Sequence, residues 1–217
     1  MNTILPFDDI QRRFDKPVRL EQMGLDQLGT IVARHPHRIL NTAVTVWRRY
    51  VEKNPATDPL AVHDYVRMKG ASFLDATGAV LGSPVIKDIS FSRCTIDDPA
   101  LADHLVAYLL VARVFPNDVH IADLNLMNPY KPIPPHLRRY RFRKYGGLGL
   151  LGSVMARIDA YAVSQKCDSI TLTAEADDLV PLFSKYGFMV EGEDVASLDM
   201  KKVVGQRAAD EVEQRDG

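Results

Sequence analysis

The sequence predicts an α/β fold with a mixed central sheet and flanking helices. In Leu150–Ala162, apolar residues recur at helical spacing directly after a glycine-rich turn. Val119–Met127 and Ser169–Ala174 show the alternation and the β-branched content that are typical of strands. Asp177–Tyr186 is a short helical segment, and Gly187 stands where a left-handed C-cap belongs. Helical and extended segments therefore follow one another along the chain.

The composition is that of a single domain. With 217 residues, of which 46% are hydrophobic and 25% charged, the chain can bury a full core. The formal net charge of −1 gives no global field that would attract nucleic acid or a membrane. Two cysteines far apart in sequence are typical of reduced thiols, and Met1–Asp9 carries acids where a signal peptide carries bases. We therefore expect a cytoplasmic protein that does not contact a membrane.

The domain is expected to span residues 1–204. Within it, residues 1–16 form a loose N-terminal arm and residues 128–143 form a basic, proline-rich insertion. Residues 205–217 are a charged and flexible tail. A homodimer is left open.

The first half of the chain alternates short extended and helical patterns. We expect a strand at Pro17–Met23, a helix at Leu25–Arg34 that Pro36 interrupts, and a strongly amphipathic helix at Ile39–Val51. The apolar stripe of the last helix favours core packing for Trp47 and Tyr50.

The middle of the chain is expected to contain a hairpin and then a helix. Ala71–Ala76 and Val85–Phe91 look like antiparallel strands joined by a Thr77-Gly78 turn. Leu101–Phe115 has apolar residues at helical spacing after a start signal at Asp97–Pro99.

The glycine-rich turn Lys144–Ser153 is the strongest functional signal. Its glycines let the backbone approach a ligand, and the first N–H groups of the following helix point into the turn, as in phosphate sites. The spacing of Gly147, Gly149 and Gly152 also satisfies a dinucleotide fingerprint, with Glu175 as a ribose-binding acid. However, a basic segment instead of an apolar strand precedes the turn, and too little chain follows it for a doubly wound sheet. A helix start that binds nothing is the third alternative.

Together, the turn and the segments after it resemble the GNAT superfamily of N-acetyltransferases. The acyl-CoA loop of that family has the form Gln/Arg-x-x-Gly-x-Gly/Ala, and Lys144-Tyr-Gly-Gly147-Leu-Gly149 is similar to it with Lys in the first place. Leu182–Phe188 is similar to the terminal turn of the family, and the resemblance covers about Val119–Val203. It implies a mostly antiparallel central sheet, acetyl-CoA or a related acyl-CoA as donor, and no metal. The residues implied to bind the donor are Leu126, Met127, Lys144, Tyr145, Gly146, Gly147, Leu148, Gly149, Leu150 and Ser153.

The resemblance also implies a general base on the strand Val119–Met127. Asp123 is the first candidate and His120 the second, although a polar strand residue can equally face solvent or satisfy a neighbour. Alternation places His120 and Asp123 on opposite faces unless a bulge shifts the register. Many members place a Tyr four residues before the glycine of the terminal turn as a proton donor, but Phe183 stands there. Tyr186, another segment or solvent would have to protonate the leaving thiolate.

The acceptor is the part of the reaction that the sequence determines least. In a GNAT-like fold Trp47 or Tyr50 could face the substrate. The segment His136–Lys144 has no acid, and Arg139, Arg141 and Arg143 alternate there with aromatic residues. These arginines could meet the phosphates of CoA, bind a nucleic-acid acceptor, or form an exposed loop with neither role.

The sequence thus predicts an acyl-CoA-dependent N-acyltransferase that moves an acetyl group to a primary amine. Two alternatives stay open. One is an enzyme that modifies a nucleic-acid-linked amine, such as an aminoacyl-tRNA or a base. The other is a non-catalytic acyl-CoA-binding protein, which Phe183 suggests.

Overall fold

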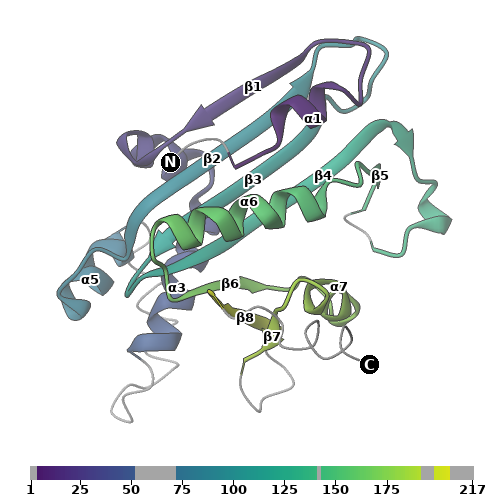
Figure 1. Ribbon diagram of the computed structural model, residues 1–217. Helices are drawn as coiled ribbons and strands as arrows, with labels where there is room; N and C mark the ends of the chain where they lie inside the picture. The colour runs from purple at the N-terminus through teal and green to yellow at the C-terminus, as the bar shows by residue number, and fades with distance from the viewer. Residues whose placement is uncertain (1–3, 52–71, 141–142, 192–197, 206–217) are drawn as a thin grey trace, which may run out of the picture.

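The computed structural model describes residues 4–51, 72–140, 143–191 and 198–205 (Figure 1). One eight-stranded sheet has the order β1-β2-β3-β4-β6-β8-β7, and β5 pairs with β4 beside this path. Every strand pair is antiparallel except β4 with β6. The predicted mixed, mostly antiparallel sheet flanked by helices is therefore confirmed. The expected tail lies outside the described residues beyond Gly205.

The strands have the following bounds: β1 Val18–Met23, β2 Ile86–Ile96, β3 Leu105–Val114, β4 Asp118–Pro132, β5 Tyr145–Gly147, β6 Ser169–Thr173, β7 Met189–Val190 and β8 Asp199–Val203. The α-helices are α1 Phe7–Gln11, α2 Leu28–Arg34, α3 Pro36–Tyr50, α5 Ser72–Leu81, α6 Leu151–Ser164 and α7 Val180–Ser184. Short 3-10 turns lie at η1 Leu25–Gln27, η2 Pro135–Leu137 and η3 Asp177–Leu179.

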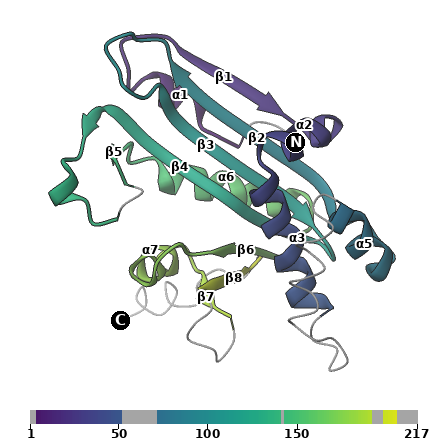
Figure 2. The same cartoon turned by 180° about the vertical axis from the view of Figure 1, so that it is seen from behind.

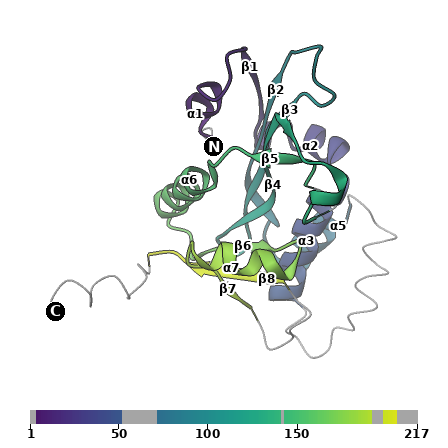
Figure 3. The ribbon, with the colours of Figure 1, turned by 90° about the vertical axis from the view of Figure 1, so that its right-hand side faces the viewer.

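Helices cover both faces of the long strands. Helices α1 and α6 lie on one face, and α2, α3 and α5 lie on the other (Figures 2 and 3). Each face has its own buried cluster, one around α6 and the other around α3. Within the described residues no helix is long and apolar enough to cross a bilayer.

The helix expected at Leu101–Phe115 is wrong, because this segment forms strand β3. All residues from Val106 to Ala112 are buried, since the strand has a helix layer on either side. A continuous apolar run satisfies the helical and the extended pattern alike, so periodicity cannot separate them.

The strand expected at Ala71–Ala76 is also wrong where the structure describes it, because Ser72–Leu81 is helix α5. Phe73 and Thr77 are buried four residues apart, which is one face of a helix. Phe73 packs against Trp47 of α3, with ring centroids 5.7 Å apart.

The N-terminal segment is packed instead of loose. Leu5 and Ile10 are fully buried, and Phe14 is nearly so, in the cluster around α6. The Oε1 atom of Gln11 accepts a hydrogen bond from the backbone N–H of Val18 at 2.8 Å. The segment therefore anchors the first strand.

Strands β4 and β6 separate near the start of β4. They pair in parallel only from Val119 to Ile121, opposite Ile170 to Leu172. Strand β6 then ends at Thr173, whereas β4 runs on to Pro132 and pairs with β5 instead. The first five residues of the segment expected as an insertion, 128–132, thus belong to a long strand. In Figure 1 the two strands diverge toward β5 and α7.

Candidate active site

A cavity of about 690 Å³ lies where β4 and β6 separate. Its first wall is Leu124–Met127 of β4, and its second is formed by α7 and by Glu175, which follows β6. The glycine turn closes one end, and its lining there includes Gly147, Leu148, Gly149, Leu150 and Leu151. The lining is mostly apolar with a few polar side chains, as small-molecule sites are.

The glycine turn is held from both sides. Gly147 pairs with Met127 of β4, while Leu148 and Leu150 are buried on either side of Gly149. Gly149 has a φ of +71°, and a Cβ built on it would have nothing within 4 Å. Helix α6 follows at once, and the first N–H groups of a helix have no partner inside it. The turn therefore offers open space and backbone donors at one end of the cavity.

Most of the residues predicted to bind the donor meet in this cavity. Leu126, Met127, Tyr145, Gly147, Leu148, Gly149 and Leu150 line it. Lys144 and Gly146 do not, because Lys144 is exposed and Gly146 faces Lys131, whose Cβ would lie 3.4 Å from a Cβ on this glycine. Ser153 lies in the first turn of α6 and does not line the cavity either.

A bulge in β4 decides which side chains share a face. Leu110 of β3 pairs with Asp123 and Val111 pairs with Ile121, so Ala122 has no partner in that register. Asp123 and His120 then face the same side as Leu110 and Ala112, toward α3. Ile121 and Leu124 both pack into the cluster around α6. The simple alternation expected for this strand fails at Ala122, and the two candidate bases come onto one face.

Asp123 lies at the inner end of the cavity and forms an ion pair with α3. Its Oδ2 atom is 3.0 Å from Nε of Arg38. Burial raises the pKa of Asp123 above its ordinary value, the Arg38 guanidinium opposes this, and the nearby Glu175 carboxylate adds to it. A carboxylate with a raised pKa beside an apolar cavity is suited to take a proton from an amine.

His120 lies deeper and is only 5% exposed. Its Nδ1 atom is 3.1 Å from the hydroxyl oxygen of Thr171. Burial lowers the pKa of His120 to about 3, assisted by the positive charge of Arg49. The ring is therefore neutral near pH 7, and His120 does not line the larger cavity.

A second cavity of about 440 Å³ opens on the α3 side of the bulge. His120 lines it, and so do Asn41, Thr45 and Arg48 of α3. Six residues line both cavities: Arg38, Asp123, Leu124, Glu175, Leu179 and Phe183. The two cavities therefore meet at Asp123.

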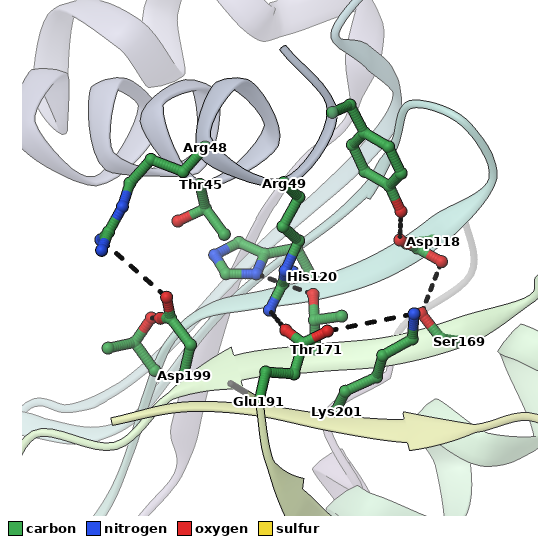
Figure 4. Close-up of polar contacts among 12 residues, drawn as sticks. Thr45, Arg48, Arg49, Asp118, His120, Ser169, Thr171, Glu191, Asp199 and Lys201 are labelled. Atoms are coloured by element: carbon green, nitrogen blue, oxygen red, sulfur yellow. Dashed lines mark hydrogen bonds and ion pairs between the residues drawn. The ribbon is translucent and has the colours of Figure 1, made fainter. Parts of the chain in front are cut away.

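Polar contacts continue from this second cavity between α3 and the strands (Figure 4). Arg49 lies 2.5 Å from Glu191, measured from Nη2 to Oε2, and Nη1 of Arg48 lies 3.9 Å from Oδ2 of Asp199. Asp118 accepts a hydrogen bond from Ser169 at 2.5 Å. The two arginines tie α3 to β8 and to the residue after β7, and the Asp118–Ser169 hydrogen bond ties β4 to β6.

The candidates for the leaving-group acid are separated. Phe183 lines both cavities and packs edge-on against Phe188, with ring centroids 6.2 Å apart. Tyr186 lines neither, and its hydroxyl lies 3.7 Å from the position that a Cβ on Gly152 would take. No hydroxyl is thus supplied by the side chain at position 183.

Trp47 and Tyr50 line neither cavity, which agrees with the core packing that the apolar stripe favours and not with contact to substrate. Trp47 is 9% exposed and packs in the cluster around α3. The hydroxyl of Tyr50 donates a hydrogen bond to Asp118, and its ring packs on Phe115 with centroids 5.4 Å apart. Both residues fix α3 to the sheet.

The basic segment lies against the entrance of the larger cavity. Nε of Arg139 is 2.7 Å from Oδ2 of Asp178, and Tyr140 also hydrogen-bonds this carboxylate, which lowers the pKa of Asp178. Tyr140 and Arg143 line the cavity. Arg141 lies outside the described residues.

Three polar residues of the site were not predicted for it. Arg38 and His35 were not considered for the site, and Glu175 was considered only as a ribose ligand. His35 lines the larger cavity and stacks on Phe91, with ring centroids 4.9 Å apart. The sequence feature that indicates Glu175 as a site residue is its position just after the strand that runs parallel to β4.

Comparisons with known proteins are distant. No family model matches the chain, and no curated protein matches it. The PaiA N-acetyltransferase of Thermoplasma acidophilum, solved with coenzyme A, is 12% identical, with a TM-score of 0.36 over 86% of this chain and 99% of that chain. An acetyltransferase of the GNAT family from Staphylococcus aureus is 10% identical, with a TM-score of 0.36 over 87% and 99%. Both of these neighbours are acetyltransferases.

Proposed function

We propose that this chain is a GNAT-like N-acyltransferase that moves an acetyl group from acetyl-CoA to a primary amine. The observation that carries the proposal is the split between β4 and β6, with the glycine turn at one end and Asp123 at the other. The split joins an anion-binding helix start to a carboxylate through one cavity. Donor binding and proton removal are the two functions that acyl transfer to an amine requires.

The larger cavity fits a CoA donor in shape and chemistry. Its apolar length along β4 suits the pantetheine arm, and the space above Gly149 suits a pyrophosphate at the start of α6. Arg143 adds a cation near this end. The donor supplies an acyl group that is activated as a thioester.

Asp123 would act on the acceptor. The acceptor ammonium gives one proton to Asp123, and its nitrogen forms a bond to the acyl carbon. The carbon–sulfur bond breaks with its electron pair going to sulfur. The second amine proton ends on the thiol, so a secondary amide and CoA are the products.

The nucleic-acid alternative receives less support from the basic segment. Arg139 and Tyr140 are bonded to Asp178, and Arg143 faces the cavity. These contacts favour a local role at the donor entrance.

A non-catalytic acyl-CoA-binding protein is the second candidate. Phe183 favours it, because a phenyl ring on the wall shared by both cavities cannot protonate a thiolate. Measurable transfer to any amine would exclude this candidate.

The proposed donor is tested by isothermal calorimetry with acetyl-CoA, NAD and S-adenosylmethionine. We expect acetyl-CoA alone to bind, and a Gly147→Asp, Gly149→Asp double variant to lose this binding, because the new carboxylates repel phosphate. Gly82→Asp is the matched control, since Gly82 has a φ of +63° and lies away from both cavities. Binding of NAD or S-adenosylmethionine without acetyl-CoA would contradict the proposal.

A further inference from the structure

We infer that the second cavity is the acceptor pocket, and that it selects a small aliphatic ammonium ion with a further N–H or O–H donor about four carbons away. This inference rests on the proposed function, because it assigns the amine side of the same reaction.

The position of the second cavity suits an acceptor. It meets the donor cavity at Asp123, so an amine held there lies next to the proposed base. One wall is a single face of α3, formed by Arg38, Asn41, Thr45 and Arg48. The opposite wall comes from the β4 bulge and the end of β6. Its volume of about 440 Å³ lies within the range of small-molecule sites.

The charges of the described lining favour a cation. Arg38 pairs with Asp123, and Arg48 lies 3.9 Å from Asp199. Glu175 is exposed and has no hydrogen bond or ion pair with the described part of the chain. Two arginines thus oppose three carboxylates, since His120 is neutral. The excess negative charge is on Glu175, next to the base, where an ammonium ion would bind.

His120 supplies a hydrogen-bond acceptor farther inside the pocket. Thr171 donates its hydroxyl hydrogen to the carbonyl oxygen of Val119 at 3.4 Å, so its oxygen accepts from Nδ1–H of His120 at 3.1 Å. The proton on Nδ1 leaves Nε2 as an unprotonated acceptor. Nε2 has no partner among the described residues, although the side chain is 95% buried and lines the cavity. A ligand that fills this pocket therefore has to donate a hydrogen bond to it.

The bulge sets the distance between the two residues that would hold the ends of the ligand, Asp123 and His120. His120 and Asp123 pair with Ala112 and Leu110, which are two residues apart on β3. Two residues along a strand span about 6–7 Å. This matches the distance between the ends of a four-carbon diamine. Apolar side chains such as Val44, Leu172 and Phe183 line the pocket and suit the aliphatic stem.

Four amines of equal chain length test this specificity. We would measure kcat/KM from the release of CoA thiol with 1,4-diaminobutane, 4-aminobutanol, butylamine and 4-aminobutanoate. The expected order places the diamine and the amino alcohol at least tenfold above butylamine, which lacks a distal donor. 4-Aminobutanoate should be the poorest, because its carboxylate meets Nε2 and adds a negative charge. Preference for 4-aminobutanoate, or no transfer to any of the four, would overturn the inference.

Variants separate the proposed contact of the ligand with Glu175 from its proposed contact with His120. Glu175→Gln should lower kcat/KM for the diamine about tenfold and weaken discrimination against 4-aminobutanoate. Asp177→Asn removes the same charge two residues farther on and outside both cavities, so it should leave both values unchanged. His120→Leu should abolish the advantage of the diamine over butylamine. If this variant does not fold, the wild-type series alone decides.

Failure of this inference is distinguishable from failure of the proposed function. Acetyl-CoA binding, measured by calorimetry without any amine, tests the donor site alone. A protein that binds acetyl-CoA but reverses the amine order keeps the proposed function and loses the assigned acceptor class. A protein that does not bind acetyl-CoA loses both.

Discussion

Arg38 and Asp123 form an ion pair with an Nε–Oδ2 distance of 3.0 Å, at the point where the two cavities meet. The pair joins α3 to the bulged strand β4. Burial and the Glu175 carboxylate raise the pKa of Asp123, and Arg38 opposes both. The guanidinium therefore limits how far the proposed base moves from its ordinary pKa.

Replacing Arg38 by Gln should move the pH dependence of activity. The base acts as a carboxylate, so activity is lost as the pH falls through the pKa of Asp123. Without Arg38 that pKa rises further, and the acidic limb of kcat/KM should shift upward by about one pH unit. Arg34→Gln is the control, because Arg34 pairs with Glu21 outside both cavities. An unshifted limb in the Arg38 variant would mean that Asp123 is not the titrating base.

Replacing Gly149 by Ala should weaken donor binding more than it weakens the fold. An alanine in the left-handed region costs about 1 kcal/mol, and the turn can relieve this strain by moving its N–H groups. We expect at least a tenfold higher Kd for acetyl-CoA by calorimetry. Gly82→Ala carries the same backbone penalty at a φ of +63° with equally open surroundings. Gly82→Ala should lower the free energy of unfolding about as much as Gly149→Ala does, and it should leave the Kd for acetyl-CoA unchanged. An equal loss of acetyl-CoA affinity in both variants would contradict the role of the turn.

Replacing Phe183 by Tyr should raise kcat. Phe183 lines both cavities and occupies the place where the resemblance implies a proton donor. A phenol there can protonate the departing thiolate, for which positioned acids give roughly a hundredfold or more. We expect a severalfold rise in kcat with a smaller change in KM, from initial rates at saturating acetyl-CoA. A fall in kcat would indicate that the acid comes from elsewhere and that the ring is needed for packing.

His120 should make the fold sensitive to acid. Its pKa is lowered to about 3 by burial and by Arg49, with Asp199 opposing. The unfolded chain takes up a proton near pH 6.5 that the folded chain does not bind, so stability is present above pH 6.5 and is lost as the pH falls. This contributes up to about 1.4 kcal/mol per pH unit between roughly pH 6 and 4.

Urea unfolding at several pH values measures this contribution. His120→Leu should make the fall of unfolding free energy with acid shallower than in the wild type. His37→Gln is the control, because His37 is exposed on α3. Identical slopes in the wild type and in the His120 variant would show that His120 is not buried as a neutral ring.

The sequence predicted the second half of the fold better than the first. Helix α6, strand β6 and the left-handed Gly187, at a φ of +85°, appear where local patterns placed them. Helix α6 has one buried face, so its periodicity is readable. Strand β6 is buried at four of its five residues, and its β-branched content indicated a strand. Strand β3 has two buried faces, and its residues fit a helix equally well. Whether a continuous apolar run forms a helix or a strand is decided by the elements that pack around it.

The candidate site was predictable only in part. The glycine turn is local in sequence and was found from its residues. Asp123 was proposed from the sequence and lines the cavity, but its partner Arg38 comes from α3, and only tertiary packing brings the two together. The bulge at Ala122 puts His120 and Asp123 on one face, and nothing in the strand sequence marks it. The two roles considered for Trp47 stayed open because an aromatic residue on an apolar stripe can serve the core or a pocket, and the structure places it in the core.

A crystal structure of the protein with CoA tests the proposed function most directly. We expect the pantetheine arm to lie along Leu124–Met127 of β4, in the split beside β6. We also expect the pyrophosphate at the N–H groups between Leu148 and Gly152, with the thiol directed toward Asp123. CoA bound outside this split, or with its thiol turned away from Asp123, would contradict the proposed function.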